Sequence, residues 1–318
     1  MPTSNTLPRL TILTPSFNAA RYIGESVESV ARQAYPDLEH IVLDAGSTDG
    51  TLDILRSHAS LRVICEPDAG AHDAMNKGIR RASGEVVGFL NTDDIYPAGI
   101  LSIVGQAFAD DPSLDVVVGR TVVFEEGERG SRRVVVARDH ARENGFWLPE
   151  LLFGAPGFNG RFFRRRVFER IGEFRNDYYI SADRHFLTRI AIAGLKARHI
   201  ARTSVLYRLH HGSATINAQA RQIESIAREH IRMAIEFRGT TRDQGQCRIF
   251  DAWQALEGIK LVLADIRASH PAKALLDLVG LFRRQPLWML RIPRFASLRN
   301  AVRRLDRGPE AVSGESLS

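Results

Sequence analysis

Short apolar runs alternate with helix-like segments along the first third of the chain. Four buried strands are predicted, at residues 10–14, 40–43, 61–65 and 86–90. The first three are followed by segments with apolar residues at helical spacing, at residues 20–32, 51–58 and 71–81. Strands and helices that alternate at this interval predict right-handed crossovers, a parallel sheet, and loops gathered at one edge of that sheet.

The pattern becomes less regular after residue 110. Further strands are predicted at residues 114–118, 121–124, 134–136 and 197–209. Between residues 144 and 160, aromatic residues mix with glycine and proline without the period of a helix or a strand. A helix is predicted at 180–193, with Ser181 or Asp183 at its start. Beyond residue 215 the pattern is helical, at about 218–237 and 247–269 and in shorter pieces after Pro271 and Pro286.

Two adjacent acids stand directly after the fourth strand. The residues at this strand end are Asn91, Thr92, Asp93 and Asp94. Side-by-side carboxylates repel each other unless a cation or hydrogen-bond donors offset their charge. A divalent ion such as Mg²⁺ or Mn²⁺ takes one or two protein carboxylates and leaves positions for substrate oxygens, which would explain the pair. The alternative is that Asp93 or Asp94 caps a helix that begins at about Pro97.

The other loops at the same predicted edge are also polar. The carboxyl ends of parallel strands line the ligand crevice of an open α/β sheet. The residues expected to converge there are Asn18, Asp44, Asp68 and Asp93. Such loops offer N–H groups for phosphate, polar groups for a base and ribose, and acids for a cation. The sequence has no GxxxxGK(S/T) loop and no GxGxxG after the first strand, which disfavours a kinase, an ATPase or an NAD-dependent dehydrogenase.

Composition narrows the class of protein. The 318 residues are 44% hydrophobic and 25% charged, as in soluble globular proteins with one large domain or two. Cys65 and Cys247 form neither a disulfide framework nor a metal-ligand spacing. The N-terminal residues lack a signal-peptide pattern, and no apolar run approaches the ~18 residues that a membrane-spanning helix needs. We therefore expect a protein of the cytoplasm.

Charge is distributed unevenly along the chain. Residues 1–120 contain 9 basic and 16 acidic side chains, which gives a net charge of −7. Residues 121–318 contain 34 basic and 21 acidic side chains, which gives a net charge of +13. Residues 273–307 interleave arginines with leucines, phenylalanines and Trp288. A basic amphipathic segment is typical of a helix on an anionic membrane surface. The alternative is a helical appendage packed against the rest of the chain or a second subunit. Residues 308–318 are expected to form a disordered tail.

Five motifs, in their order along the chain, resemble those of family-2 glycosyltransferases. They are TPSFN at 14–18, VLDAGSTDGT at 42–51, EPDAGAHDAMNKGI at 66–79, GEVVGFLNTDD at 84–94, and FFRRRVFERIGEF followed by ISADRHFLTR within 162–189. The resemblance covers residues 8–215 and implies the GT-A fold, an α/β fold whose Rossmann-like, mostly parallel central sheet is flanked by helices.

The resemblance also implies a division of the chain into domains. The catalytic domain would span residues 1–215, with a nucleotide-sugar half at about 8–120 and an acceptor half at about 121–215. A basic helical C-terminal region would follow at residues 216–307, before the tail.

A set of donor-binding residues follows from the resemblance. By position, Thr14, Pro15 and Asp44 match the nucleotide pocket of the family. The other candidates for the nucleotide-sugar site are Asn18, Asp68, Asn76, Lys77, Asn91, Thr92 and Asp93. Ala45 stands where the family usually has a second acid, so the resemblance alone leaves recognition of the base unresolved.

The resemblance implies a metal and a catalytic base as well. Asp93 and Asp94 match the DxD-type element that holds Mg²⁺ or Mn²⁺ against the donor diphosphate, with Asn91 in place of its first acid. Asparagine still offers an oxygen ligand. His210 and His211 lie in the polar turn after the last strand, and His211 is taken as a further metal-ligand candidate, although the sequence does not rank the two. The alternative is a pair of surface histidines. Asp183 matches the carboxylate that acts as catalytic base, and the alternative is that it only caps its helix.

Together these features predict a cytoplasmic, metal-dependent, inverting glycosyltransferase whose donor is a nucleotide sugar, with a UDP sugar as the first choice. The acceptor would be a hydroxyl of a glycan or lipid-linked molecule in cell-envelope polysaccharide synthesis. The enzyme would be peripheral on the cytoplasmic face of the membrane. Residues 144–160 fit an acceptor-side wall and a packed loop equally well.

Two alternatives stay open at this point. One is a sugar nucleotidyltransferase, although the chain lacks the Gly-rich basic loop that such an enzyme carries near its N-terminus. The other is a non-catalytic protein that binds nucleic acid or a membrane surface on a degenerate GT-A scaffold. The main hypothesis expects no nucleic-acid partner and leaves the oligomeric state open.

Overall fold

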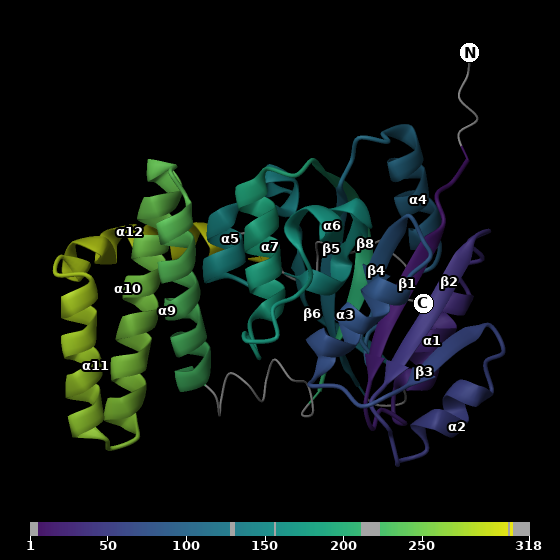
Figure 1. Ribbon diagram of the computed structural model, residues 1–318, viewed down its shortest axis with the longest axis horizontal. Coiled ribbons are helices and arrows are strands. Elements are labelled where there is room, and N and C mark those ends of the chain that lie inside the picture. Colours follow the sequence, from purple (N-terminus) through teal and green to yellow (C-terminus); the bar gives the residue numbers. More distant parts are fainter. Residues whose placement is uncertain (1–5, 128–130, 156, 211–222, 305, 308–318) are drawn as a thin grey trace.

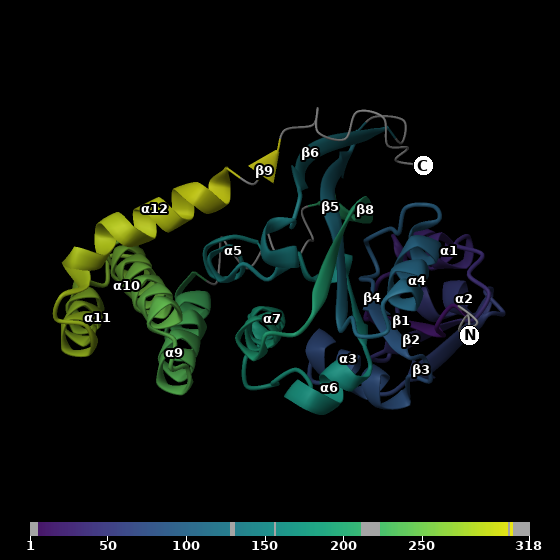
Figure 2. The ribbon, with the colours of Figure 1, turned by 90° about the horizontal axis from the view of Figure 1, so that it is seen from above.

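The computed structural model describes residues 6–127, 131–155, 157–210, 223–304 and 306–307 of the chain. Three regions lie side by side in Figure 1: a sheet of purple and blue strands with its helices, a central teal region, and a group of green and yellow helices. The view from above in Figure 2 shows the same order.

The N-terminal half of the chain builds the parallel part of the sheet. Its strands are β1 (Leu10–Ser16), β2 (Leu38–Asp44), β3 (Leu61–Cys65) and β4 (Val86–Phe89), in the spatial order β3-β2-β1-β4 with parallel pairing throughout. The helices α1 (Ile23–Ala31), α2 (Thr51–Arg56) and α3 (Ala71–Arg81) connect them. β1 and β4 are buried almost along their whole length, as apolar strands covered on both faces should be. The predicted alternation of strands and helices is confirmed.

The second half extends this sheet with both antiparallel and parallel pairs of strands. After α4 (Ile100–Asp110), the strands are β5 (Val116–Glu126), β6 (Arg132–Arg138), β7 (Arg161–Arg164) and β8 (Ala197–Leu209), with the short β9 (Asp306–Arg307) beside β6. β7 lies between β4 and β5 and is antiparallel to both, while β8 pairs with β5 in parallel. Consequently β4, β5 and β8 point the same way, and the carboxyl ends of β4 and β8 lie at one edge of the sheet.

Several elements of this second half differ from the prediction. β7 was not expected, because a strand of four residues with arginine at both ends carries no clear alternation. Residues 144–160 contain α5 (Leu148–Phe153) and a 3₁₀ turn (Phe158–Gly160). α5 is only six residues long and has proline in its first turn, so it is too short to show a helical period. The two strands predicted at 114–118 and 121–124 are one strand, β5, whose pairing shifts register near residue 120.

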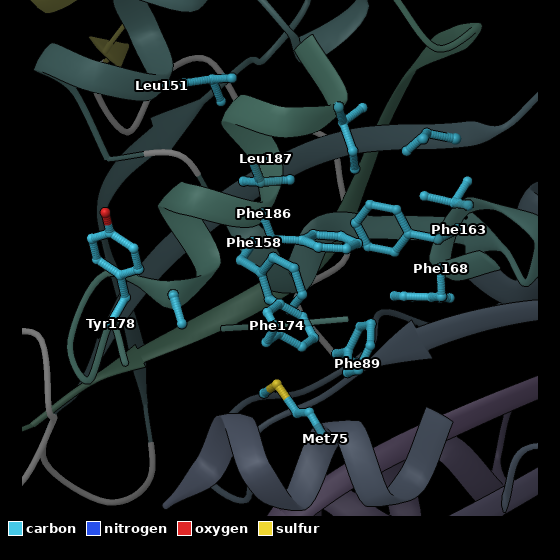
Figure 3. Close-up of a cluster of buried hydrophobic side chains, with 14 of the residues drawn as sticks. Met75, Phe89, Leu151, Phe158, Phe163, Phe168, Phe174, Tyr178, Phe186 and Leu187 are labelled. Atoms are coloured by element: carbon cyan, nitrogen blue, oxygen red, sulfur yellow. The ribbon is translucent and has the colours of Figure 1, made fainter. Parts of the chain in front are cut away.

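One aromatic cluster joins the parallel strands to the helices that follow them (Figure 3). Phe89 of β4 lies between 5.1 and 6.2 Å, centroid to centroid, from the rings of Phe158, Phe163, Phe168 and Phe174. Phe186, on α7 (Ala182–Ala193), is 4.7 Å from Phe174 and stacks on Phe168, which belongs to α6 (Arg166–Ile171). Because aromatic rings bury large areas, this cluster fixes α7 against the end of β4.

The C-terminal helices pack on the same core. α9 (Ile223–Thr240), α10 (Gln244–Arg267) and α11 (Pro271–Arg284) form the helical group at the left of Figure 1. Phe237, Phe250 and Trp253 of α9 and α10 belong to the same buried cluster as Phe186. After a 3₁₀ turn (Trp288–Arg291), α12 (Ile292–Arg303) runs back from this group toward β6 in Figure 2.

The predicted C-terminal helical extension is therefore present. In the part of the chain that the structure describes, no helix combines the length and apolar character needed to cross a bilayer. The tail predicted at 308–318 lies outside the described residues.

Candidate functional site

The loop after β2 is organised around the carboxylate of Asp44, which is 1% exposed. Its Oδ2 accepts hydrogen bonds from the hydroxyls of Ser16 and Ser47, at 2.9 and 2.7 Å. Its Oδ1 accepts from the backbone N–H groups of Gly46 and Ser47, at 3.0 and 2.7 Å. A carboxylate offers about four acceptor positions. The four hydrogen bonds therefore use the acceptor capacity of Asp44 to hold the loop in shape.

The loop after β1 docks on the loop after β2. Asn18 has a positive φ of 48°, a conformation that asparagine tolerates. Its backbone N–H donates to Ser47 Oγ at 2.8 Å, and its Oδ1 accepts from the N–H of Thr48 at 2.9 Å. By contrast, the side chain of Thr14 is buried and hydrogen-bonded to His40 Nε2 at 3.0 Å. Asn18 and Asp44 therefore converge as predicted, with the half-buried Pro15 at the end of β1.

Three further candidates lie in the β3–α3 loop and on α3, Asp68 in the loop and Asn76 and Lys77 on the helix, and each has partners inside the protein. Asp68 Oδ1 accepts from the N–H of Gly70 at 2.8 Å. The buried amide of Asn76 makes two hydrogen bonds to the backbone of Phe174. Its Nδ2 donates to the Phe174 carbonyl at 2.9 Å, and its Oδ1 accepts from the Phe174 N–H at 2.9 Å. Lys77 donates to the carbonyl of Pro67 at 2.6 Å. These side chains support the loop and its contact with the aromatic cluster.

The two acids after β4 have different environments. Asp94 is fully buried, whereas the side chain of Asp93 is 23% exposed. Asp94 Oδ2 accepts from the amides of Asn159 and Asn91 at 2.7 and 3.4 Å, and Oδ1 accepts from the N–H of Arg208 at 3.1 Å. Burial, together with the neighbouring charge of Asp93, raises the pKa of the Asp94 carboxyl well above its usual value. Asp93 is therefore the acid of the pair that reaches the surface.

The helix-cap alternative for these two acids is wrong. α4 begins at Ile100, its N-cap residue is Gly99, and no side chain caps it. Thr92 is half-buried in the same turn.

Arg208, near the end of β8, completes this edge and was not singled out in the sequence. Its Nε donates to the carbonyl of Asp93 at 2.9 Å, and its two terminal nitrogens bond the carboxylates of Glu25 and Glu126. Its guanidinium also lies 4.7 Å from the ring centroid of Tyr22. Arg208 and Asn159 lie 115 and 65 residues from their partners in the Asp93–Asp94 turn, so no local pattern could have identified them.

A divalent metal at this edge would rely mainly on Asp93. His210 Nε2 lies 3.0 Å from Asp93 Oδ2, so an imidazole nitrogen and a carboxylate oxygen stand together. Within the described residues, no group of three or more His, Cys, Asp or Glu side chains could hold a metal. One carboxylate is nevertheless enough for Mg²⁺ when diphosphate oxygens and water supply the other ligands. The predicted ligand His211 lies outside the described residues.

Asp183 lies in the first turn of α7 and is half-buried. The N-cap of α7 is Ser181, and no side-chain hydrogen bond caps the helix. The nearby His72, in the first turn of α3, interacts electrostatically with Asp183 and with Glu229 of α9. Burial lowers the pKa of His72, although the two carboxylates oppose the shift, so its imidazole is neutral at pH 7. Asp183 therefore lies near the first turn of α3, the helix that follows the carboxyl end of β3.

Comparison with known proteins gives a consistent result. The family model "Glycosyl transferase family 2" matches residues 11–172. A PGL/p-HBAD biosynthesis glycosyltransferase of Mycobacterium bovis is 31% identical over 189 residues, which are 57% of this chain and 69% of that protein. TuaG of Bacillus subtilis, named for teichuronic acid biosynthesis, is 42% identical over 96 residues, which are 29% of this chain and 38% of TuaG.

Solved structures share the fold. Residues 1–349 of S. aureus TarS in complex with UDP-GlcNAc superpose with a TM-score of 0.62 at 17% identity, covering 92% of this chain and 90% of that one. The chain spans about half, 54%, of a longer TarS structure. The mannosyltransferase PcManGT of Pyrobaculum calidifontis, in complex with GDP-Man and Mn²⁺, gives a TM-score of 0.58 at 24% identity over 92% of this chain and 85% of that one.

The buried pair of Thr14 and His40 predicts a pH effect on stability. Burial lowers the pKa of His40 to about 3, so between pH 6.5 and pH 3 the unfolded chain binds a proton that the folded chain does not. The free energy of unfolding therefore falls as the pH drops below 6.5, by up to about 1.4 kcal/mol per pH unit from this residue. We expect His40→Gln to remove this contribution to the pH dependence of the free energy of unfolding, as measured by urea titrations at several values between pH 7 and pH 5.

The exposed His270 provides the matched control, because His270→Gln should keep the wild-type slope. Equal slopes for the wild type and His40→Gln would contradict the prediction.

Proposed function

Since the chain belongs to glycosyl transferase family 2, we propose that it transfers a sugar, with inversion, from a nucleotide sugar to a hydroxyl of a glycan or lipid-linked acceptor. The observation that carries the proposal is the pair of partly exposed carboxylates of Asp93, in the turn after β4, and Asp183, in the first turn of α7 near His72 of α3. Structures of similar fold bind UDP-GlcNAc and GDP-Man, and a UDP sugar is our first choice of donor. Family membership favours a glycosyltransferase over a nucleotidyltransferase or a non-catalytic binding protein.

Asp183 acts as the general base. Its carboxylate takes the proton of the acceptor hydroxyl while that oxygen attacks the anomeric carbon from the side opposite the diphosphate. Asp183 lies in the first turn of α7, so the helix holds it on a rigid element. One displacement inverts the anomeric centre, so no nucleophile of the chain is needed.

Asp93 would hold the divalent cation, Mn²⁺ or Mg²⁺, together with the diphosphate of the donor. The cation would supply positive charge against the negative charge that develops on the departing diphosphate. The buried Asp94 keeps the turn in place through its bonds to Arg208 and Asn159. The loops at Asn18 and Asp44 form the wall of the nucleotide pocket.

A thermal-shift experiment tests the donor and the metal together. A ligand that binds only the folded chain raises its stability, by about 2.7 kcal/mol at a hundred times Kd. We expect UDP-GlcNAc or GDP-mannose with Mn²⁺ to raise the Tm of the wild type by several degrees, and Asp93→Ala to lose the Mn²⁺-dependent part. Asp53→Ala, which changes an exposed acid on α2, should keep the full shift. No shift with any nucleotide sugar would contradict the proposal.

Substitution of the base tests the catalytic step. Loss of a general base lowers turnover by about 10²- to 10⁴-fold, so Asp183→Asn should lose donor hydrolysis and transfer to that extent while its donor-induced thermal shift stays. Release of the nucleoside diphosphate from the donor is the measurement, because water serves as acceptor. Glu169→Gln, at an exposed acid on α6, is the control. Near-normal turnover of Asp183→Asn would show that the base lies elsewhere.

We further propose that the acceptor belongs to cell-envelope glycan synthesis and that the enzyme works on the cytoplasmic face of the membrane. The TuaG relative, named for teichuronic acid biosynthesis, supports the first part. The second rests on an apolar surface of α11, where Leu275, Leu276, Val279 and Phe282 are 38–72% exposed and share one helix face. Leu287 and Leu290, just beyond α11, are also exposed, as are Arg283, Arg284 and Arg294, which lie close to them in the sequence. This surface suits an anionic bilayer.

Vesicle binding tests the membrane proposal. The wild type should sediment with vesicles that contain anionic lipid and much less with neutral ones. Because burial of one leucine contributes about 1.5–3 kcal/mol, Leu276→Glu should weaken binding by about ten-fold or more. Ile103→Glu, at an exposed apolar residue of α4, should bind like the wild type. Equal binding by both variants would remove the membrane proposal.

A further inference from the structure

The backbone that leads into the proposed base is held by a carboxylate from a different region of the chain. Glu229 of α9 accepts hydrogen bonds from three consecutive backbone N–H groups. The N–H of Tyr179 lies 2.8 Å from Oε1, that of Ser181 lies 2.9 Å from Oε2, and that of Ile180 lies 3.3 and 3.2 Å from the two oxygens. Both oxygens of Glu229 are therefore used to bind one turn.

The same face of α9 binds the loop at further points. Glu236 accepts from the hydroxyl of Tyr178 at 2.8 Å and lies 3.1 Å from Nε2 of His185 on α7. The guanidinium of Arg232 lies 3.9 Å from the ring centroid of Tyr178. Residues 229, 232 and 236 have helical spacing. α9 therefore presents a polar face to residues 178–181, immediately before α7.

The hydrogen bonds to Glu229 hold the turn that directly precedes Asp183. Ser181 is the N-cap residue of α7 and makes no side-chain cap, and Asp183 follows two residues later. Without Glu229, three adjacent N–H groups would lose their charged acceptor, and the turn could adopt other conformations. Glu229 and Asp183 both interact electrostatically with His72 of α3, so the two carboxylates lie near the same part of the site.

We propose that Glu229 is a positioning residue for the proposed base, because it fixes the turn from which Asp183 reaches the acceptor hydroxyl. The inference rests on the role proposed for Asp183. It also assigns a function to α9, because the C-terminal helical region then supplies a part of the site without touching the donor.

The first variant is Glu229→Gln, which keeps the size of the side chain but replaces one acceptor oxygen with a donor group that opposes an N–H of the turn. A displacement of about 1 Å at a catalytic group can cost 10²-fold in rate. We therefore expect Glu229→Gln to release UDP from UDP-GlcNAc, or GDP from GDP-mannose if that donor gives the larger thermal shift, about 10- to 100-fold more slowly. The donor-induced thermal shift should stay at its wild-type size. Glu224→Gln, also on α9 but bonded to the exposed Arg228 and Lys273, should retain wild-type turnover.

The double variant Glu229→Gln, Asp183→Asn separates positioning from a general loss of structure. If Glu229 acts through Asp183, the double variant should be no slower than Asp183→Asn alone. A further full 10- to 100-fold loss would show that Glu229 serves the fold and would overturn the inference, while leaving Asp183 as base. Wild-type turnover of Glu229→Gln would overturn it as well. Wild-type turnover of Asp183→Asn would instead show that the proposed function of Asp183 has failed, and the inference with it.

Discussion

Three distant parts of the chain meet at the buried carboxylate of Asp94. The turn after β4 contains it, the 3₁₀ turn before β7 contributes the amide of Asn159, and β8 contributes the N–H of Arg208. A buried carboxylate that loses its partners costs several kcal/mol, so these donors must come together for the edge of the sheet to form. Once they do, Asp93 is left on the outer side of the same turn, beside His210.

The antiparallel β7 is the structural device that makes this meeting possible. It separates β4 from β5, and because it is antiparallel to both, β8 arrives with its carboxyl end beside that of β4. Arg208 therefore stands in the sheet next to the acid pair, where Glu25 and Glu126 balance its charge. The aromatic cluster around Phe89 packs α7, which carries Asp183 in its first turn, against the end of β4.

The C-terminal helices have two different faces. The inner face of α9 carries Glu229 and Glu236, which bind the loop before α7. The outer face of α11 carries exposed leucines, such as Leu276, next to arginines. The sequence predicted this helical region only as basic and amphipathic. In the structure, the region supports a loop of the candidate site through α9 and exposes apolar side chains on α11.

Local patterns in the sequence were enough to predict the parallel half of the sheet, because strand and helix periods and the polar loops between them involve only neighbouring residues. β3, α3 and β8 begin and end where the pattern predicts, and the motifs led to the family. The difference between the two acids, with Asp94 buried and Asp93 partly exposed, came from three-dimensional packing, since adjacent carboxylates look alike in a sequence. The tertiary structure alone revealed Asn159, Arg208 and Glu229, because hydrogen bonds between residues some 50 to 115 positions apart leave no periodic signal in the chain.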